Sequence, residues 1–442
     1  MSPPVDQVPS DETLPKQADV VVIGGGIIGT VAAYELAIRG HSVALLEKGR
    51  IAGEQSSRNW GWCRVHGRAI PALPLATASL RLWGGMDREI GRPTGFRQSG
   101  VMTVLQTEAD RAYWEHWLEE ARPYQLDGRM LSRAEVAERL PGRASPGLGG
   151  MWSAMDGRAE PARAAPAIAA AARERGATLH QGCAARGLET TAGAVSAVVT
   201  EKGRIRTGAV LLAGGAWASM FCRRHGIRFP QSGVVATAFR TEPGAVVTPG
   251  GVTDGRYAMR LRDDGGYTVA LAGSGRVELT PQKFRYALDF IPLFLKRRKK
   301  LTFSIGRSFV EGPEAAARWS LDSASPFERL RVLDPAPGSE LVEAALAMLR
   351  TDYPALAQAR VAQAWGGLID STPDAQPVIS QVQEVPGFYL AAGFSGLGFG
   401  LGPASGRLAA DLITGAAPIV DPAPYRLARF SDRSQLRPEA RM

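Results

Sequence analysis

One stretch near the N-terminus, ADVVVIGGGIIGTVAAYELAIRGHSVALLEKG, constrains the fold more than any other part of the 442-residue chain. Residues 20–23 form an apolar run that predicts a buried parallel strand, followed by glycines with GxGxxG spacing at Gly24, Gly26 and Gly29. A helix and a second strand ending at Glu47 complete a βαβ pattern. This pattern predicts a dinucleotide-binding unit, in which the backbone at Gly26 approaches a pyrophosphate and Glu47 accepts hydrogen bonds from a ribose.

The segment that follows this unit distinguishes between the two common dinucleotides. In NAD dehydrogenases the βαβ pattern usually continues at once, whereas here the polar stretch RIAGEQSSRNWGWCRVHGR interrupts it. FAD is the longer molecule, and a polar segment rich in small residues suits the path of its ribityl chain. We therefore predict FAD, with the hydroxyls of Ser56 and Ser57 donating to pyrophosphate or ribityl oxygens.

Composition excludes several classes of protein. The net charge is +9, but the basic residues are scattered apart from one run, KRRKK at 296–300, and no zinc-finger or RRM pattern is present. A nucleic-acid partner is therefore not expected. The three cysteines are far apart and odd in number, which argues against a disulfide framework and favours a reducing compartment such as the cytoplasm. No metal is expected, since Cys63 and His66 lack two further ligands.

The remaining patterns predict an α/β (α+β) chain of two domains. An apolar strand that ends at Gly214 and Gly215 suggests the far half of a nucleotide-binding sheet, and several alternating stretches suggest an inserted antiparallel sheet. The polar, proline-rich N-terminus predicts a disordered tail. The predicted parts are a tail at 1–16, a Rossmann-like FAD-binding domain from 17–90, 150–228 and 361–432, and a substrate domain from 91–149 and 229–360.

Two features point to the site of chemistry. In YAMRLR, residues 257–262, apolar and cationic side chains alternate, so Arg260 lies either on a solvated face or where its guanidinium can bind a substrate carboxylate. Near the C-terminus, GFSGLGFGLGP predicts a glycine-rich turn before a helix. The N-terminus of that helix can stabilise negative charge on a reduced flavin.

Several stretches resemble the D-amino-acid-oxidase-like FAD oxidoreductases, a superfamily that includes glycine and sarcosine oxidases and amino-acid dehydrogenases. They are DVVVIGGGIIG, LLEKG, WGGLIDSTPDAQPVI and GFSGLGFGLGPASGRLAADLI. Others are similar to the bacterial L-amino-acid deaminase and L-amino-acid oxidase branch, among them KGRIAGEQSSR, LLAGGAW, LTFSIG and IVDPAPYRLARF. The resemblance covers nearly the whole chain after about Leu14.

This resemblance implies FAD-dependent oxidative deamination of L-amino acids, in which a hydride passes from the substrate Cα to flavin N5 and the imino acid hydrolyses to a 2-oxo acid and ammonia. It places Arg260 at the position of the arginine that binds the substrate carboxylate. A D-amino-acid, N-methyl-amine or hydroxyproline dehydrogenase stays open, as does a flavoprotein subunit without catalysis. The sequence does not distinguish oxygen from a quinone as the electron acceptor.

The resemblance and the motifs together predict the contacts of the site. Arg64 and His66, in the loop after Ser57, and Leu397 are expected to approach the substrate pocket, with Trp60 and Trp62 near the flavin ring. The expected FAD contacts are Gly24, Gly26, Ile28, Gly29, Glu47, Lys48, Gln55, Ser56, Ser57, Arg58, Ala185, Gly214, Gly215, Trp217, Gly367, Gly396, Leu397, Gly398 and Phe399. The cofactor is expected to be non-covalent, because no cysteine follows Cys222.

The stretch TPQKFRYALDFIPLFLKRRKK predicts an apolar helix over 281–300 that starts after an N-cap at Thr280, is kinked at Pro292 and ends in a basic cluster. Such a helix packs against its own domain or a homodimer partner, or it touches an anionic membrane. In the related deaminases a helical insertion near this position is linked to the membrane, but their N-terminal hydrophobic anchor is absent here. We expect a soluble cytoplasmic enzyme with at most a weak, salt-sensitive peripheral contact.

Overall fold

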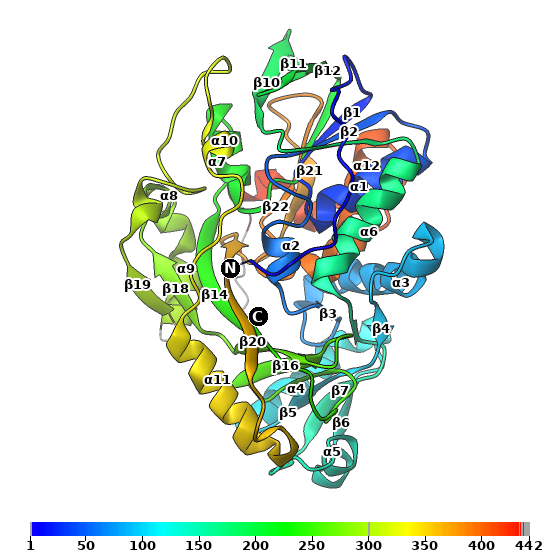
Figure 1. The fold of residues 1–442 in the computed structure, drawn as a ribbon, viewed down its shortest axis with the longest axis vertical. Coiled ribbons are helices and arrows are strands. Elements are labelled where there is room, and N and C mark those ends of the chain that lie inside the picture. The colour runs from blue at the N-terminus through cyan, green and yellow to red at the C-terminus, as the bar shows by residue number, and fades with distance from the viewer. Residues whose placement is uncertain (1, 299–300, 433, 435, 437–442) are drawn as a thin grey trace.

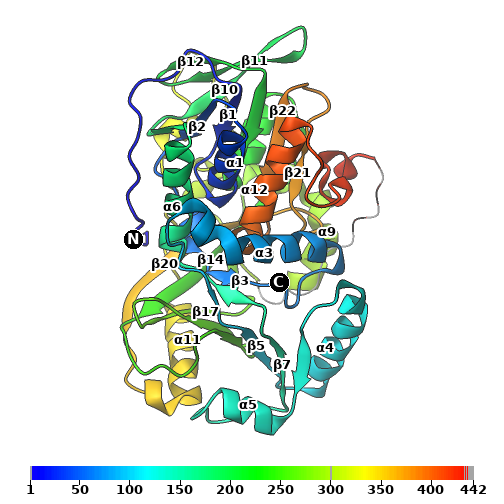
Figure 2. The same ribbon diagram turned by 90° about the vertical axis from the view of Figure 1, so that its right-hand side faces the viewer.

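The computed structural model describes residues 2–298, 301–432, 434 and 436 (Figure 1). A six-stranded sheet forms the upper body in the view of Figure 2, and all its strands are parallel except β21, which is antiparallel to β22. In sheet order the strands are β21 (Val378–Gln381), β22 (Phe388–Ala392), β13 (Ala209–Leu212), β1 (Val20–Ile23), β2 (Val43–Glu47) and β9 (Thr178–Gln181).

Apolar side chains on both faces explain why this sheet is buried. Along β1, Val20 and Val22 pack in a core with three helices, whereas Val21 and Ile23 face a second core on the opposite side. The helices of the first core are α1 (Ile27–Ile38), α6 (Pro161–Glu174) and α12 (Gly398–Thr414). The opposite side carries α7 (Ala218–Arg224) and the small sheet of β10 (Ala185–Thr191), β11 (Ala194–Thr200) and β12 (Gly203–Arg206).

The glycine motif closes the first βαβ unit as predicted. Gly24 has a φ of +113°, and a Cβ there would lie 2.3 Å from the Ala213 carbonyl oxygen. A Cβ on Gly29 would lie 2.0 Å from the Gly24 carbonyl oxygen, so only glycine lets α1 approach β1 this closely. Both glycines are thus required by the turn and by the packing of helix on strand.

The second body is built on a mixed ten-stranded sheet, lower in Figure 2. The path runs through β19 (Leu301–Ser304), β18 (Gly275–Glu278), β14 (Ser232–Thr241), β17 (Tyr267–Leu271), β16 (Tyr257–Leu261), β15 (Gly251–Thr253), β5 (Val101–Val104), β7 (Gly150–Ser153) and β6 (Arg129–Leu131), and β20 (Val361–Ser371) pairs with β14. The sheet is not purely antiparallel, because β15 runs parallel to β5 and β18 parallel to β19.

Two predicted domain boundaries differ from the strand pairing. The predicted FAD-binding domain includes residues 150–153 and 361–371, but β7 and β20 pair with strands of the large sheet. Alternation within a strand shows that it is half buried but not which sheet it joins.

Further elements around the bodies are α2 (Gln55–Arg58), β3 (Trp62–Cys63), α3 (Leu73–Ile90), β4 (Arg97–Gln98), α4 (Glu108–Ala121), α5 (Arg133–Arg139), β8 (Gly157–Arg158), α10 (Pro326–Arg329) and α11 (Ser339–Asp352).

The N-terminal segment is ordered against the upper body, which corrects the prediction of a disordered tail. The blue trace in Figure 2 follows the side of this body, and Val8 is buried in its core. The Asp11 carboxylate pairs with Arg173 at 2.7 Å and accepts the Leu179 N–H at 2.9 Å. These partners lie far away in the sequence, so polar composition gave no sign of them.

The predicted apolar helix is divided into α8 (Pro281–Arg285) and α9 (Ala287–Arg297). Thr280 is the N-cap as predicted, but the break comes at Tyr286, and Pro292 lies inside α9. Lys299 and Lys300 of the basic cluster lie outside the described residues. No helix among the described residues has the length and apolar character needed to cross a bilayer.

Candidate active site

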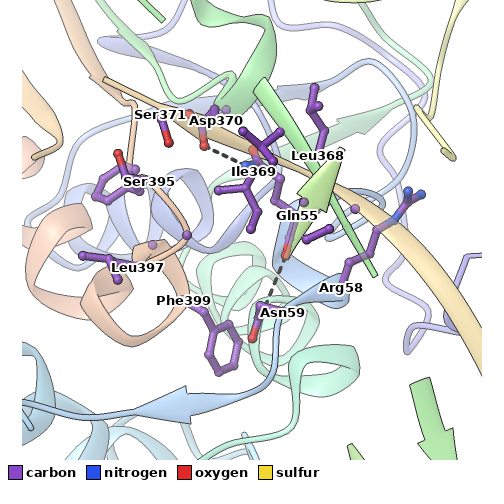
Figure 3. Close-up of a pocket in the computed structure, with 18 of the residues that line it drawn as sticks. Gln55, Arg58, Asn59, Leu368, Ile369, Asp370, Ser371, Ser395, Leu397 and Phe399 are labelled. Carbon is purple, nitrogen blue, oxygen red and sulfur yellow. Dashed lines mark hydrogen bonds between the residues drawn. The ribbon is translucent and has the colours of Figure 1, made fainter. Parts of the chain in front are cut away.

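A cavity of about 1200 Å³ lies between the two bodies. Its walls come from the β1–α1 turn, the segment around α2, the residues before α12, and the inner side of the large sheet. Figure 3 shows part of this lining, with residues of α2 and β20 close to the turn that leads into α12. The cavity therefore joins the predicted cofactor residues to the predicted substrate domain.

The cofactor end fits the predicted dinucleotide. The Ile27 N–H at the start of α1 donates to Ser56 Oγ at 2.8 Å, and a Cβ on Gly26 would approach that hydroxyl to 3.0 Å. Glu47 ends β2, and its carboxylate accepts the N–H groups of Gly25 and Gly49 at 2.8 and 2.7 Å. Burial raises the pKa of Glu47. The pyrophosphate of FAD requires a helix N-terminus and a backbone that it can approach closely, and its ribose requires a carboxylate at the end of the strand. This end of the cavity offers all three.

The structure brings together nearly all predicted FAD contacts. Gly29 and Ser57 do not line the cavity, because Gly29 supports α1 against β1 and the Ser57 hydroxyl donates to Glu54 O. The predicted contacts that do line it are Gly24, Gly26, Ile28, Glu47, Lys48, Gln55, Ser56, Arg58, Ala185, Gly214, Gly215, Trp217, Gly367, Gly396, Leu397, Gly398 and Phe399. Trp60 and Trp62 line it as well.

Arg58 contributes its stem rather than its charge to the cavity. Its guanidinium donates to Gly366 O at 3.2 Å and to Ser2 Oγ at 2.7 Å, and it pairs with Asp334 at 3.3 Å. Figure 3 shows the guanidinium directed away from Phe399. Arg58 is among the expected FAD contacts, but only the aliphatic part of its side chain, and not its guanidinium, is placed to make that contact.

Asp370 organises the centre of the site, and the sequence patterns did not lead us to it. It ends the apolar part of β20, and its buried carboxylate accepts Gln55 Nε2 at 2.6 Å, Gln231 Nε2 at 2.7 Å and the Gly393 N–H at 2.9 Å. Burial raises the pKa of this carboxyl. Figure 3 shows Asp370 joined to Gln55 across the lining. The sequence feature that could have indicated Asp370 is an aspartate directly after the apolar residues near the end of this strand.

The predicted substrate arginine is not in the cavity. Arg260 is fully buried, with Nη1 and Nη2 donating to the two Glu160 oxygens at 2.6 and 3.1 Å and Nε donating to Trp60 O at 2.6 Å. This arrangement corrects the expectation that Arg260 binds a substrate carboxylate. The polar face of β16 is turned inward, onto the carboxylate of Glu160. Glu160 lies 100 residues away in the sequence, so the alternation of residues within β16 cannot reveal this contact.

The other predicted pocket residues separate into two groups. Arg64 and Leu397 line the cavity, whereas His66 is buried behind it. His66 Nε2 lies 2.8 Å from Thr103 Oγ1, its ring packs edge-on against Trp114, and burial lowers its pKa well below the usual value. A neutral, buried His66 positions its neighbours and does not face the cavity.

A further part of the lining comes from residues that the sequence patterns do not single out, although their elements lie in the predicted substrate domain. Thr103 lies on β5, and Tyr113 and Trp114 lie on α4. Trp114 packs edge-on against Tyr113, with ring centroids 5.3 Å apart. The aromatic run AYWEHW in α4 was the only signal, and it is equally typical of ordinary core packing.

Residues 19–412 match the model of the DAO family, described as FAD dependent oxidoreductase. The chain is 26% identical to sarcosine oxidase subunit beta of Rhizobium meliloti over 421 residues, 93% of this chain and 88% of that protein. It is 26% identical to glycine oxidase of Geobacillus kaustophilus over 426 residues, 93% and 97% of the two chains.

Among solved structures, the L-amino acid deaminase from Proteus myxofaciens, in complex with anthranilate, is similar, with a TM-score of 0.93 and 32% identity. The match covers 98% of this chain and 97% of that one. The chain therefore belongs to the DAO family of FAD-dependent oxidoreductases and is an enzyme that acts on amino acids or amines.

Proposed function

We propose that this enzyme catalyses the oxidative deamination of L-amino acids to 2-oxo acids and ammonia. The observation that carries the proposal is the match to the Proteus deaminase over nearly the whole of both chains, including both walls of the cavity. When bound, FAD supplies the acceptor for the hydride that leaves the substrate Cα.

The residues of this chain contribute positioning and electrostatics. Asp370 holds Gln55 and the Gly393 N–H in place through buried hydrogen bonds. The first N–H groups of α12 follow Leu397 and favour negative charge at the adjacent cavity wall. Trp60 and Trp62, whose rings meet edge to face with centroids 5.8 Å apart, add apolar surface to the lining of the same cavity.

A second candidate is oxidation of glycine or an N-methyl amino acid. The sequence relatives favour it, because glycine oxidase and sarcosine oxidase subunit beta both align over more than nine-tenths of this chain. An N-methyl group that is oxidised leaves as formaldehyde, which distinguishes an N-methyl substrate from an L-amino acid by its products. Glycine releases ammonia and the 2-oxo acid glyoxylate, so it is distinguished from L-amino acids by which substrate is turned over.

The test uses the purified holoenzyme and an artificial dye as electron acceptor, so that turnover does not depend on oxygen or a quinone. L-amino acids, their D-enantiomers, glycine and sarcosine are supplied in parallel. We expect ammonia and a 2-oxo acid from L-amino acids, with little turnover of the D-forms. Formaldehyde production from sarcosine without turnover of any L-amino acid would favour the second candidate. Acid precipitation should leave the flavin in the supernatant, because we expect non-covalent binding.

A further inference from the structure

Asp370 connects segments that lie far apart in the sequence. Its carboxylate accepts Gln55 Nε2 at 2.6 Å, Gln231 Nε2 at 2.7 Å and the Gly393 N–H at 2.9 Å. Its carbonyl oxygen accepts the Ser395 N–H at 2.8 Å. Gln55 lies in α2, Gln231 precedes β14, and the other two partners belong to the turn before α12. One residue of the large sheet therefore holds α2 and this turn in place.

Backbone donors fix the orientation of both glutamine amides. The Ala216 N–H donates to Gln55 Oε1 at 3.2 Å. The Ser219 N–H donates in the same way to Gln231 Oε1 at 3.1 Å. A backbone N–H can only donate, so each amide directs its oxygen toward the backbone and its NH2 group toward Asp370. The groups that meet this carboxylate are therefore hydrogen-bond donors.

The surroundings of Asp370 favour an ionised carboxylate. Hydrogen bonds from three donors stabilise the charged form, whereas burial opposes it and raises the pKa of the carboxyl. The donors are uncharged amides, and no lysine, arginine or histidine among the described residues forms an ion pair with Asp370. Asp370 is only 3% exposed, yet it lines the cavity. Its negative charge is thus weakly screened and acts on a group that is bound there.

We propose that Asp370 is a positioning residue of the flavin site, and that its ionised carboxylate lowers the reduction potential of bound FAD. Gln55 is itself a predicted FAD contact, and Gln231 Nε2 also donates at 2.9 Å to the carbonyl of Gly215, which is another. Electrons added to the flavin make it more negative, so a nearby carboxylate disfavours the reduced form. The N-terminus of α12 acts in the opposite sense. This role of Asp370 is the same whichever amino acid or amine the enzyme oxidises.

The test measures the reduction potential of the flavin in the holoenzyme, by equilibration with a reference dye and without any substrate. Asp370→Asn removes the charge at nearly constant volume. At a fixed potential it should raise the ratio of reduced to oxidised flavin about tenfold, the order of magnitude for one charge removed from a site of low polarity. Tenfold corresponds to about 30 mV for a two-electron couple. Asp370→Glu keeps the charge and should stay closer to the wild-type ratio.

Two further variants separate the charge of Asp370 from its positioning role. Asp264→Asn removes a carboxylate from an exposed hairpin of the same sheet, outside the cavity lining, and should leave the potential unchanged. Gln231→Met keeps the charge of Asp370 but loses the contact with Gly215. It should speed FAD release from the diluted holoenzyme about fivefold, the equivalent of one hydrogen bond, without raising the potential. Flavin fluorescence follows this release.

Each half of the proposal can fail separately. An Asp370→Asn protein with the wild-type potential would overturn the assigned charge. Wild-type rates of FAD release in both Asp370→Asn and Gln231→Met would contradict the positioning role. If Asp370→Asn is purified without flavin, the positioning role is supported, and Asp370→Ser, whose hydroxyl can accept the Gly393 N–H, measures the effect of the charge instead. Because no substrate is used, these outcomes are independent of whether the enzyme oxidises L-amino acids.

Discussion

Arg260 and Glu160 form an ion pair with almost no access to solvent, and this pair joins the two bodies of the molecule. Arg260 belongs to β16 of the large sheet, whereas Glu160 immediately precedes α6 of the FAD-binding body. Each charge is expensive to bury alone, so the pair is strongly coupled. Its contribution is to hold the bodies together around the cavity rather than to bind a ligand.

Removing one partner of this pair should therefore destabilise the protein. We expect Arg260→Met to lower the free energy of unfolding by about 3–5 kcal/mol, because Glu160 would stay buried with only the longer 3.6 Å contact to Arg158 to offset its charge. The double variant Arg260→Met/Glu160→Gln should recover part of this loss. Urea unfolding of the holoenzymes measures both. A stable Arg260→Met variant with a large rise in KM would contradict the structural role and restore the role that the sequence resemblance implied.

Asp156 is a second residue whose effect is testable, through the pH dependence of stability. Burial raises the pKa of the Asp156 carboxyl from 3.8 to about 7. The N–H groups of Val65 and His66, which donate to this carboxylate, lower the pKa but do not outweigh burial. Between these values the folded protein keeps a proton that the unfolded chain has lost. Folding is therefore favoured less as the pH rises through this window.

The matched comparison is wild type against Asp156→Asn, which cannot titrate. The difference in unfolding free energy, wild type minus variant, should fall by up to about 1.4 kcal/mol per pH unit as the pH rises from about 5 to about 7. Urea unfolding at several pH values gives this difference. Parallel curves for the two proteins would show that Asp156 stays ionised across the range.

At the scale of elements, the site depends on how closely α1 and β1 approach each other. The contact between Gly29 and the Gly24 carbonyl has no room for a methyl group. The start of α1 meets the cofactor end of the cavity at Gly26 and Ile28. Any shift of this helix should therefore move the N–H groups that face the pyrophosphate.

Gly29→Ala should thus lower the flavin content of the purified protein and its thermal midpoint together. Gly84→Ala is the control, since Gly84 lies inside α3 and a Cβ added there would meet no heavy atom of a neighbouring element within 4 Å. It should bind flavin normally and gain about 0.5–1 kcal/mol, as alanine usually does over glycine in a helix. The flavin-to-protein absorbance ratio decides between these outcomes, and a fully loaded Gly29→Ala protein would contradict the packing argument.

At the scale of the whole molecule, α8, α9 and β19 form an apolar outer surface, which we call the α9 surface. Leu293 is buried, whereas Leu288 is 81% exposed. The exposed apolar residues of the surface are Phe284, Leu288, Ile291, Phe294, Leu295 and Phe303. Ile291, Phe294 and Phe303 of this surface also line the cavity, so the surface is continuous with the cavity wall. An apolar patch bordered by basic residues is typical of a contact with an anionic membrane surface.

We expect the protein to bind anionic vesicles only weakly at low salt and not at high salt, because salt screens the attraction between the basic residues and the lipid surface. Leu288→Asp/Leu295→Asp should weaken binding by opposing both the apolar and the charge contribution. Val246→Asp, at an exposed valine outside the α9 surface, is the control. Equal binding by the double variant would contradict this docking mode, and concentration-dependent dimerisation that the double variant abolishes would assign the surface to a second copy of the chain.

Much of the cofactor end followed from the sequence, because its signals are local. Gly24, Gly29 and Glu47 act within one βαβ unit of about 30 residues, where spacing alone determines which backbone atoms meet. The turn before α12 could also be predicted from the sequence, because the glycine-rich turn and the helix that follows it are adjacent in the chain. Ser57 and the Arg58 guanidinium lie beside the predicted contacts but turn away, because side-chain direction in α2 depends on its packing.

The substrate end was decided by the tertiary structure. Local alternation showed that Arg260 lies on the polar side of a strand, but only the fold places Glu160 opposite it and leaves Arg64 facing the cavity. Likewise, Asp11 forms its ion pair with Arg173 only in the folded chain. The physical reason is that the function of a charged side chain depends on which opposite charge lies within a few ångströms. Sequence spacing does not determine that distance for residues 100 or more positions apart.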